Sequence, residues 1–247
     1  MLRNFAYRWI LPFIDPRSLI AIIRLPRFFS EWRRYRRMGG GDARFADLWP
    51  CLTDRVGYTP FDPHYFFQAA WIARQLAAAK PTLHVDVGSS IAMLGVLSAQ
   101  FPLVFVDYRP LKVRLDGLNT IAGDITRLPF ADASIASLSS LHVIEHIGLG
   151  RYGDPIEPSG YVAALRELDR VLAPGGQLYL STPVGRERVC FNAHRVFSPR
   201  TILNALPKLK VLRFALVDDS GRFQEPCDLP GADSLSYGCG MFVLTKT

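Results

Sequence analysis

The chain has 247 residues, of which 49% are hydrophobic and 21% are charged, and its formal net charge is +7. This composition excludes a disordered chain, and the length allows one sizeable domain with an extension rather than two full domains. Residues 1–37 contain nine arginines and two acidic residues, so they supply the whole excess charge and the remainder is neutral. A basic nucleic-acid-binding domain is therefore not indicated.

The first segment, residues 1–41, is predicted to be a basic helical arm, followed by the main domain at residues 42–247. Pro12, Pro16 and Pro26 are expected to break the arm into short helices, because proline lacks an amide donor and clashes with the preceding turn.

The last part of this arm carries aromatic residues at helical spacing, Phe28, Trp32 and Tyr35, with arginines around them. This mixture is typical of a helix that lies on an anionic lipid surface. A second interpretation stays open, in which the helix packs on the main domain as a lid.

The sequence shows no apolar run long enough for a transmembrane helix, and its N-terminal apolar runs are interrupted by Arg8, Asp15 and Arg17, unlike a secretory signal. Its four cysteines form no C-x-x-C pair, which fits reduced thiols. We therefore predict a cytoplasmic protein, peripheral on the inner face of the membrane if the arm binds lipid.

Beyond residue 62, strand and helix patterns alternate along the chain. Helices are predicted over residues 64–79, 91–100, 161–172 and 199–206, and strands over 83–87, 103–107, 120–122, 135–141, 177–181, 211–217 and 241–245. This alternation predicts an α/β domain of the Rossmann type, with a mostly parallel sheet and helices on both faces. No helix separates the last two strands, so we expect an antiparallel strand at the C-terminal edge.

The turn after the first predicted strand has features of a nucleotide site. Gly88 lets the backbone approach a ligand closely. Asp107 ends the next strand, 21 residues after Asp86, and its carboxylate can accept both hydroxyl hydrogens of a ribose. Asp124 follows the third strand, where it can contact an adenine edge. Only one glycine of a G-x-G-x-x-G pattern is present, and Ser90 takes another small position, so binding of NAD is not indicated.

Five stretches between residues 60 and 185 together form one further pattern through their order along the chain. They are Asp86-Val-Gly88, Asp107, Gly123-Asp124-Ile-Thr-Arg-Leu-Pro-Phe, Leu141-His-Val-Ile-Glu145-His146 and Leu168-Asp-Arg-Val-Leu-Ala-Pro-Gly-Gly. In this order they resemble class I methyltransferases that depend on S-adenosylmethionine (SAM). The resemblance implies a Rossmann-like SAM-methyltransferase fold and SAM as the cofactor. The residues expected to bind it are Asp86, Gly88, Ser89, Ser90, Asp107, Tyr108, Asp124, Ile125 and His142.

Residues 139–154 and 183–197 are also similar to a family of uncharacterised methyltransferase-like proteins. Its members were first described from nematodes and are frequent in bacterial surface-polysaccharide gene clusters. This similarity implies a fold and a context rather than a particular reaction.

Two segments that follow the fourth and fifth strands hold three of the five histidines. A histidine can take a proton from a hydroxyl group while that group attacks a methyl donor. We therefore predict that His146 or His194 acts as the base, with Glu145 beside the first of them. The alternative stays open that Glu145 and His146 only order their loop, and that His194 and Arg195 only brace the two segments.

The same two segments are expected to bind the substrate. Their arginines would hold an acidic or phosphorylated sugar. The predicted residues are Arg151, Tyr152, Asp154, Arg186, Arg188 and Asn192.

The stretch from His142 to His146 also matches the H-x-x-E-H arrangement of certain zinc peptidases. That arrangement requires a helix, whereas His142 is expected at the end of a strand, where neighbouring residues face opposite ways. No metal-binding residues are therefore predicted.

Together these patterns predict a SAM-dependent methyltransferase that acts on a hydroxyl oxygen of a sugar, glycan or lipid-linked saccharide in polysaccharide biosynthesis. One alternative is an inactive methyltransferase-like protein that serves as a binding or scaffold module, suggested by the single glycine of the turn. Another is a sugar-modifying or hydrolytic enzyme that works without SAM. The expected partners are a small-molecule or glycan acceptor and an anionic membrane surface, and not nucleic acid.

Overall fold

The computed structural model describes residues 17–247, in a chain that divides into two compact units, Met1–Pro60 and Phe61–Thr247. The sequence had suggested a boundary near Gly41. The first unit contains helix α2 (Arg17–Arg37) and the short 3-10 helix η1 (Phe45–Asp47). Among the described residues, no helix combines the length and the apolar character needed to cross a membrane.

Pro26 lies inside α2, so the prediction that this proline ends a helix is wrong. A proline removes one main-chain hydrogen bond, but other contacts hold this helix to the segment that follows it. The Trp32 indole donates to the carbonyl oxygen of Ala43 at 2.9 Å, and the Arg24 guanidinium donates to that of Leu52 at 2.8 Å. Pro12 and Pro16 lie outside the described residues.

The second unit is built on an eight-stranded sheet. Its strands are β1 (His84–Val87), β2 (Leu103–Asp107), β3 (Leu118–Ala122), β4 (Ile135–Leu141), β5 (Leu172–Val184), β8 (Leu209–Val217), β9 (Phe223–Gln224) and β10 (Gly238–Lys246). Its helices are α3 (Pro63–Ala79), α4 (Ile91–Leu97), α5 (Gly160–Val171), α6 (Pro199–Ala205) and α7 (Leu229–Ala232).

The strand order is β3-β2-β1-β4-β5-β10-β8-β9, and strands β1 to β5 pair in parallel with one another. Strand β10 is antiparallel to both β5 and β8 and lies between them. The predicted α/β fold, mostly parallel with an antiparallel C-terminal strand, is confirmed. The order reverses between β1 and β4, and open parallel sheets bind ligands at such a reversal, beyond the carboxyl ends of the strands.

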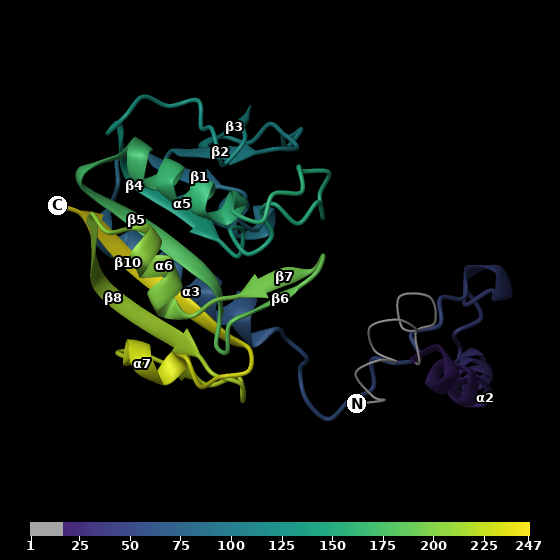
Figure 1. Cartoon of the computed structure of the whole chain (residues 1–247). Helices are drawn as coiled ribbons and strands as arrows, with labels where there is room; N and C mark the ends of the chain where they lie inside the picture. The colour runs from purple at the N-terminus through teal and green to yellow at the C-terminus, as the bar shows by residue number, and fades with distance from the viewer. Residues whose placement is uncertain (1–16) are drawn as a thin grey trace. The chain divides into compact units, whose positions relative to one another are not determined.

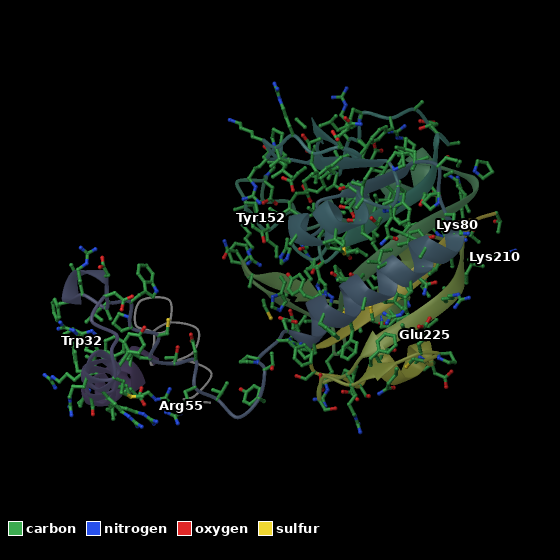
Figure 2. All side chains as sticks on the ribbon, turned by 180° about the vertical axis from the view of Figure 1, so that it is seen from behind. Trp32, Arg55, Lys80, Tyr152, Lys210 and Glu225 are labelled. Carbon is green, nitrogen blue, oxygen red and sulfur yellow. The ribbon has the colours of Figure 1, made fainter. Side chains whose placement is uncertain are left out.

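Helices cover both faces of the sheet and bury a separate hydrophobic cluster on each. On one face, Leu165 of α5 and Ile202 of α6 are fully buried. On the other face, Ile72 of α3 and Leu94 of α4 are buried to the same degree. Figure 1 shows α5 and α6 in front of the sheet with α3 behind it, and Figure 2 shows the reverse side.

The segment after β5 contains a hairpin that the sequence did not predict, formed by β6 (Arg188–Cys190) and β7 (His194–Val196). Its strands are too short to leave a clear alternation of apolar and polar residues. The hairpin projects from the same end of the sheet as the loop between β4 and α5 (Figure 1). The two segments predicted to carry the chemistry therefore lie at one end of the sheet.

Candidate functional site

A cavity of about 460 Å³ lies at the carboxyl ends of β1, β2 and β4, where the strand order reverses. This volume falls in the range of small-molecule sites. Six of the residues predicted to bind the cofactor line it: Gly88, Asp107, Tyr108, Asp124, Ile125 and His142.

The turn at Gly88 leaves this cavity open. Gly88 has a φ of +74°, and a β-carbon there would lie 3.0 Å from a methyl group of Val143, so both conformation and space require glycine. The described residues that line the cavity do not include Ser90 or Met93, so these side chains leave the space beside the turn unfilled.

Asp86 stabilises the turn through hydrogen bonds from Ser89 and does not line the cavity. Its carboxylate is fully buried and accepts hydrogen bonds from the Ser89 amide at 3.1 Å, from the Ser89 hydroxyl at 2.7 Å, and from the Ser139 hydroxyl. Burial raises the pKa of Asp86 to about 6, although these hydrogen bonds oppose the shift. Asp86, Ser89 and Ser90, three predicted cofactor residues, are thus placed outside the cavity wall.

Two further carboxylates do face the cavity, and each is oriented by its own turn. Oδ1 of Asp107 accepts from the Arg109 amide at 2.7 Å. Oδ1 of Asp124 accepts from both the amide and the hydroxyl of Thr126, each at 2.8 Å. The cavity therefore presents two fixed acceptor groups, one at the end of β2 and one after β3.

Glu145 is buried between two histidines of the loop after β4. Its side chain is 1% exposed, and Oε1 lies 2.8 Å from His142 Nδ1 and 3.8 Å from His146 Nε2. Oε2 accepts from the Thr182 hydroxyl at 3.4 Å. Glu145 is placed to orient the His142 ring by a hydrogen bond, lies near the His146 ring without bonding to it, and does not line the cavity.

His146 lines the cavity and has a defined tautomer. Its Nδ1 lies 2.7 Å from the carbonyl oxygen of Ala193 and 3.3 Å from Nη1 of Arg151, which donates to the same carbonyl at 2.8 Å. Because the carbonyl is the nearer partner and can only accept, we assign the ring proton to Nδ1 and the lone pair to Nε2. Burial lowers the pKa of His146, and Glu145 opposes this shift. A neutral imidazole with a free Nε2 is the form that accepts a proton.

His142 has a strained backbone and a full set of partners. Its φ of +55° is unusual for a residue with a side chain. Nδ1 faces Glu145, and Nε2 lies 3.3 Å from the Cys239 sulfur. Burial lowers the pKa of His142, but the charges of Cys239 and Glu145 outweigh it, so that the pKa lies well above its usual value.

His194 is placed outside the cavity lining, on strand β7, where its ring packs against Tyr237 with centroids 5.0 Å apart. Burial lowers the pKa of His194. Its neighbour Arg195 is 5% exposed and donates to the carbonyl oxygens of Ile147 at 2.6 Å and Pro158 at 3.2 Å. Arg195 thus ties the hairpin to the loop after β4.

The predicted substrate residues separate into two groups. Tyr152 and Asp154 line the cavity, and Tyr152 is visible near the edge of the second unit in Figure 2. The Asp154 carboxylate accepts from the amides of Gly148 at 2.9 Å and Tyr152 at 3.1 Å, so it shapes the loop. Outside the cavity lining are Arg151, Arg186, Arg188 and Asn192.

Two arginines flank the ring of Tyr152. The guanidinium carbon of Arg109 lies 4.7 Å from the ring centroid and that of Arg151 lies 5.0 Å from it. Arg109 also lines the cavity and was not predicted, although its position two residues after Asp107 placed it at the same strand end.

A protein-family model described as "Caenorhabditis protein of unknown function, DUF268" matches residues 130–206. The match covers less than half of the chain but includes β4, α5, β5 and the β6–β7 hairpin. It therefore contains Glu145, His146 and His194. No curated protein matches the sequence significantly.

Several solved structures share the fold at low sequence identity. The [4+2]-cyclase SpnF aligns with a TM-score of 0.55 and 13% identity, over 78% of this chain and 84% of that one. The N-methyltransferase NodS from Bradyrhizobium japonicum WM9, in complex with S-adenosyl-L-homocysteine, aligns with a TM-score of 0.53 and 16% identity. The alignment covers 86% of this chain and 97% of NodS. Geranyl diphosphate methyltransferase in complex with SAM aligns with a TM-score of 0.52 and 14% identity, over 73% of this chain and 85% of that one.

The chain has the fold of class I methyltransferases. Because a cyclase shares this fold with methyltransferases, the fold alone does not select a reaction, and only the residues of the site can indicate one.

Proposed function

We propose that this protein is a SAM-dependent methyltransferase. The observation that carries the proposal is the open cavity at the strand reversal, with the Gly88 turn and the Asp107 carboxylate both in its wall. A carboxylate at that strand end suits the two hydroxyls of a ribose. Asp124 and the apolar side chain of Ile125, also in the wall, suit the edge and face of an adenine ring.

His146 is the proposed base. When bound, SAM supplies an electrophilic methyl group on a positively charged sulfur. The chain's own contribution is to hold an acceptor hydroxyl in line with that group and to take its proton on His146 Nε2. The hydrogen bond from Nδ1 to Ala193 fixes the ring, and the imidazolium formed lies near the Glu145 carboxylate. Glu145 is accordingly a positioning residue.

The acceptor is proposed to be a hydroxyl oxygen of a sugar, glycan or lipid-linked saccharide that carries an acidic or phosphate group. Arg109, which lines the cavity beside Tyr152, supports this choice, because guanidinium groups bind carboxylates and phosphates through paired hydrogen bonds. Arg151 lies against the same Tyr152 ring, outside the cavity lining. Such an acceptor belongs to polysaccharide biosynthesis.

The N-terminal unit is proposed to contact an anionic membrane surface at the site of synthesis. Ile22 and Ile23 of α2 are 61% and 79% exposed, and arginines occupy the same helix. Trp32 is not part of this surface, because its indole is bonded to Ala43.

Calorimetry with SAM and with S-adenosylhomocysteine tests the proposal. The wild-type chain is expected to bind both, and Asp107→Ala to weaken both by roughly 10-fold or more, as for the loss of a hydrogen bond to a charged group. Asp116→Ala, an exposed acid outside the cavity lining, is the matched control. Absence of binding at millimolar SAM would overturn the proposed methyltransferase and favour the scaffold alternative.

A further inference from the structure

Three side chains that are far apart in the sequence meet at one point of the second unit. His64 comes from the first turn of α3, His142 from the loop after β4, and Cys239 from β10. One ligand atom of each lies within 4.8 Å of the other two. We propose that His64, His142 and Cys239 bind a zinc ion.

The distances suit such an ion with little rearrangement. Zinc bonds of 2.0–2.1 Å to nitrogen and 2.3 Å to sulfur, at tetrahedral angles, place ligand atoms roughly 3.5 Å apart. His142 Nε2 and the Cys239 sulfur are already 3.3 Å apart. The ligand atom of His64 lies within 4.8 Å of the other two, so a shift of its ring by roughly 1 Å completes the set.

The hydrogen-bond partner of His142 is of the kind found around zinc sites. Histidines that bind metals usually donate their other ring N–H to a carboxylate, which fixes the tautomer and aims the free nitrogen at the ion. His142 Nδ1 lies 2.8 Å from Glu145 Oε1, and its Nε2 is aimed at the sulfur. The chain holds His142 in this position with a φ of +55°, a left-handed conformation that is concentrated at functional sites.

The surroundings favour a bound cation. Cys239 is fully buried, and a zinc ion would stabilise the thiolate form of its sulfur there. The ring of Tyr237 stacks on His64 with centroids 5.2 Å apart, and that of Tyr65 packs on His142 at 5.5 Å. These rings shield the ligand atoms from water and strengthen electrostatic interactions among them.

One thiolate and two imidazoles form a ligand set suited to zinc, and three protein ligands leave a fourth position for a water or hydroxyl group. His142 also lines the cavity, so the ion borders it. The set differs from the H-x-x-E-H motif, because Nδ1 of His146 is bonded to Ala193 instead. Binding of zinc requires no methyl transfer, so this inference stands apart from the proposed function.

Metal analysis of the untagged full-length chain tests the site. After purification in zinc-containing buffer and gel filtration, the wild type is expected to retain one zinc per chain. Cobalt(II) added to the chelator-treated chain is expected to give a thiolate-to-cobalt charge-transfer band and the intense visible bands of tetrahedral coordination. Neither readout depends on SAM or on activity.

Variants show which residues bind the ion. His64→Gln and Cys239→Ala should each weaken zinc binding roughly 100-fold or more, because each removes a ligand. Glu145→Gln should weaken it roughly 10- to 100-fold, the range for residues that hold a metal-binding histidine in place. Cys190→Ala, a half-buried cysteine outside the cluster, should bind zinc as the wild type does. His64→Gln removes a partly exposed ring and keeps the test valid if Cys239→Ala fails to fold. A wild type without zinc and without the cobalt band, or wild-type affinity in His64→Gln, overturns the proposal.

Discussion

Nδ1 of His146 lies 2.7 Å from the carbonyl oxygen of Ala193, which joins the loop after β4 to the turn of the β6–β7 hairpin. The bond leaves Nε2 as the basic nitrogen of a ring that lines the cavity. His194, the other candidate base, lies outside that lining. The structure thus distinguishes two histidines that the sequence left equivalent.

His146→Gln is expected to lower kcat roughly 10²- to 10⁴-fold, because general-base catalysis contributes about that much, while the affinity for SAM changes less than about twofold. His194→Gln is the matched control and should lower kcat far less. The measurement is S-adenosylhomocysteine released with the acceptor that the wild type methylates, with calorimetry for SAM. Unchanged turnover in His146→Gln would remove the proposed role.

Gly88→Ala is expected to destabilise the fold by about 1–2 kcal/mol, the cost of a left-handed conformation for a residue with a β-carbon, and to weaken SAM binding. Gly95→Ala is the control, because Gly95 lies inside α4 with open space at its β-carbon position. That substitution should stabilise the fold by about 0.5–1 kcal/mol. Denaturant unfolding compares the two, and equal stability of both variants would contradict the account of the turn.

Asp86→Asn is expected to flatten the pH dependence of stability. The folded state keeps a proton on Asp86 up to a pKa of about 6, whereas the ordinary pKa of an aspartate is 3.8. The folded state therefore binds more protons between these values, and the stabilisation, complete below the lower pKa, is lost as pH rises through the higher one. The loss amounts to about 3 kcal/mol at most.

Denaturant unfolding at several pH values between about 4 and 7 measures this loss. The wild type should lose more stability than Asp86→Asn across that window, and Asp116→Asn should behave like the wild type. A variant with the wild-type pH profile would show that Asp86 is not the group responsible.

Replacing Ile22 and Ile23 together by aspartate is expected to abolish most co-sedimentation with anionic vesicles, since it removes apolar area and adds negative charge. Val189→Asp, a 59% exposed apolar residue of the hairpin, is the control and should bind as the wild type does. Wild-type binding should also weaken with salt. Equal sedimentation of the double variant would end the membrane proposal.

The strands that the sequence predicted best are those with buried apolar runs between clear turns. Strands β2 and β4 were predicted with the bounds that the structure has, Leu103–Asp107 and Ile135–Leu141. The hairpin and the short helix α7 were missed, because three or four residues carry too little periodicity to detect. Helix α2 continues through Pro26, because contacts along the whole helix outweigh the local penalty of one proline.

The candidate site was predictable where its residues follow consecutive strands, as Gly88, Asp107 and Asp124 do. It was not predictable where it depends on contacts between distant positions. His142 and Cys239 are 97 positions apart, and the pairing of β10 with β5 and β8 brings the cysteine to this end of the sheet. Side-chain periodicity carries no information about such a contact.

The position of β10 between β5 and β8 has a consequence for the order in which the second unit assembles. Until Gly238–Lys246 has left the ribosome, β5 and β8 both expose unpaired edges that invite aggregation. Cys239 belongs to the same strand. The same late segment therefore completes the hydrogen bonding of the sheet and brings a sulfur atom beside His142.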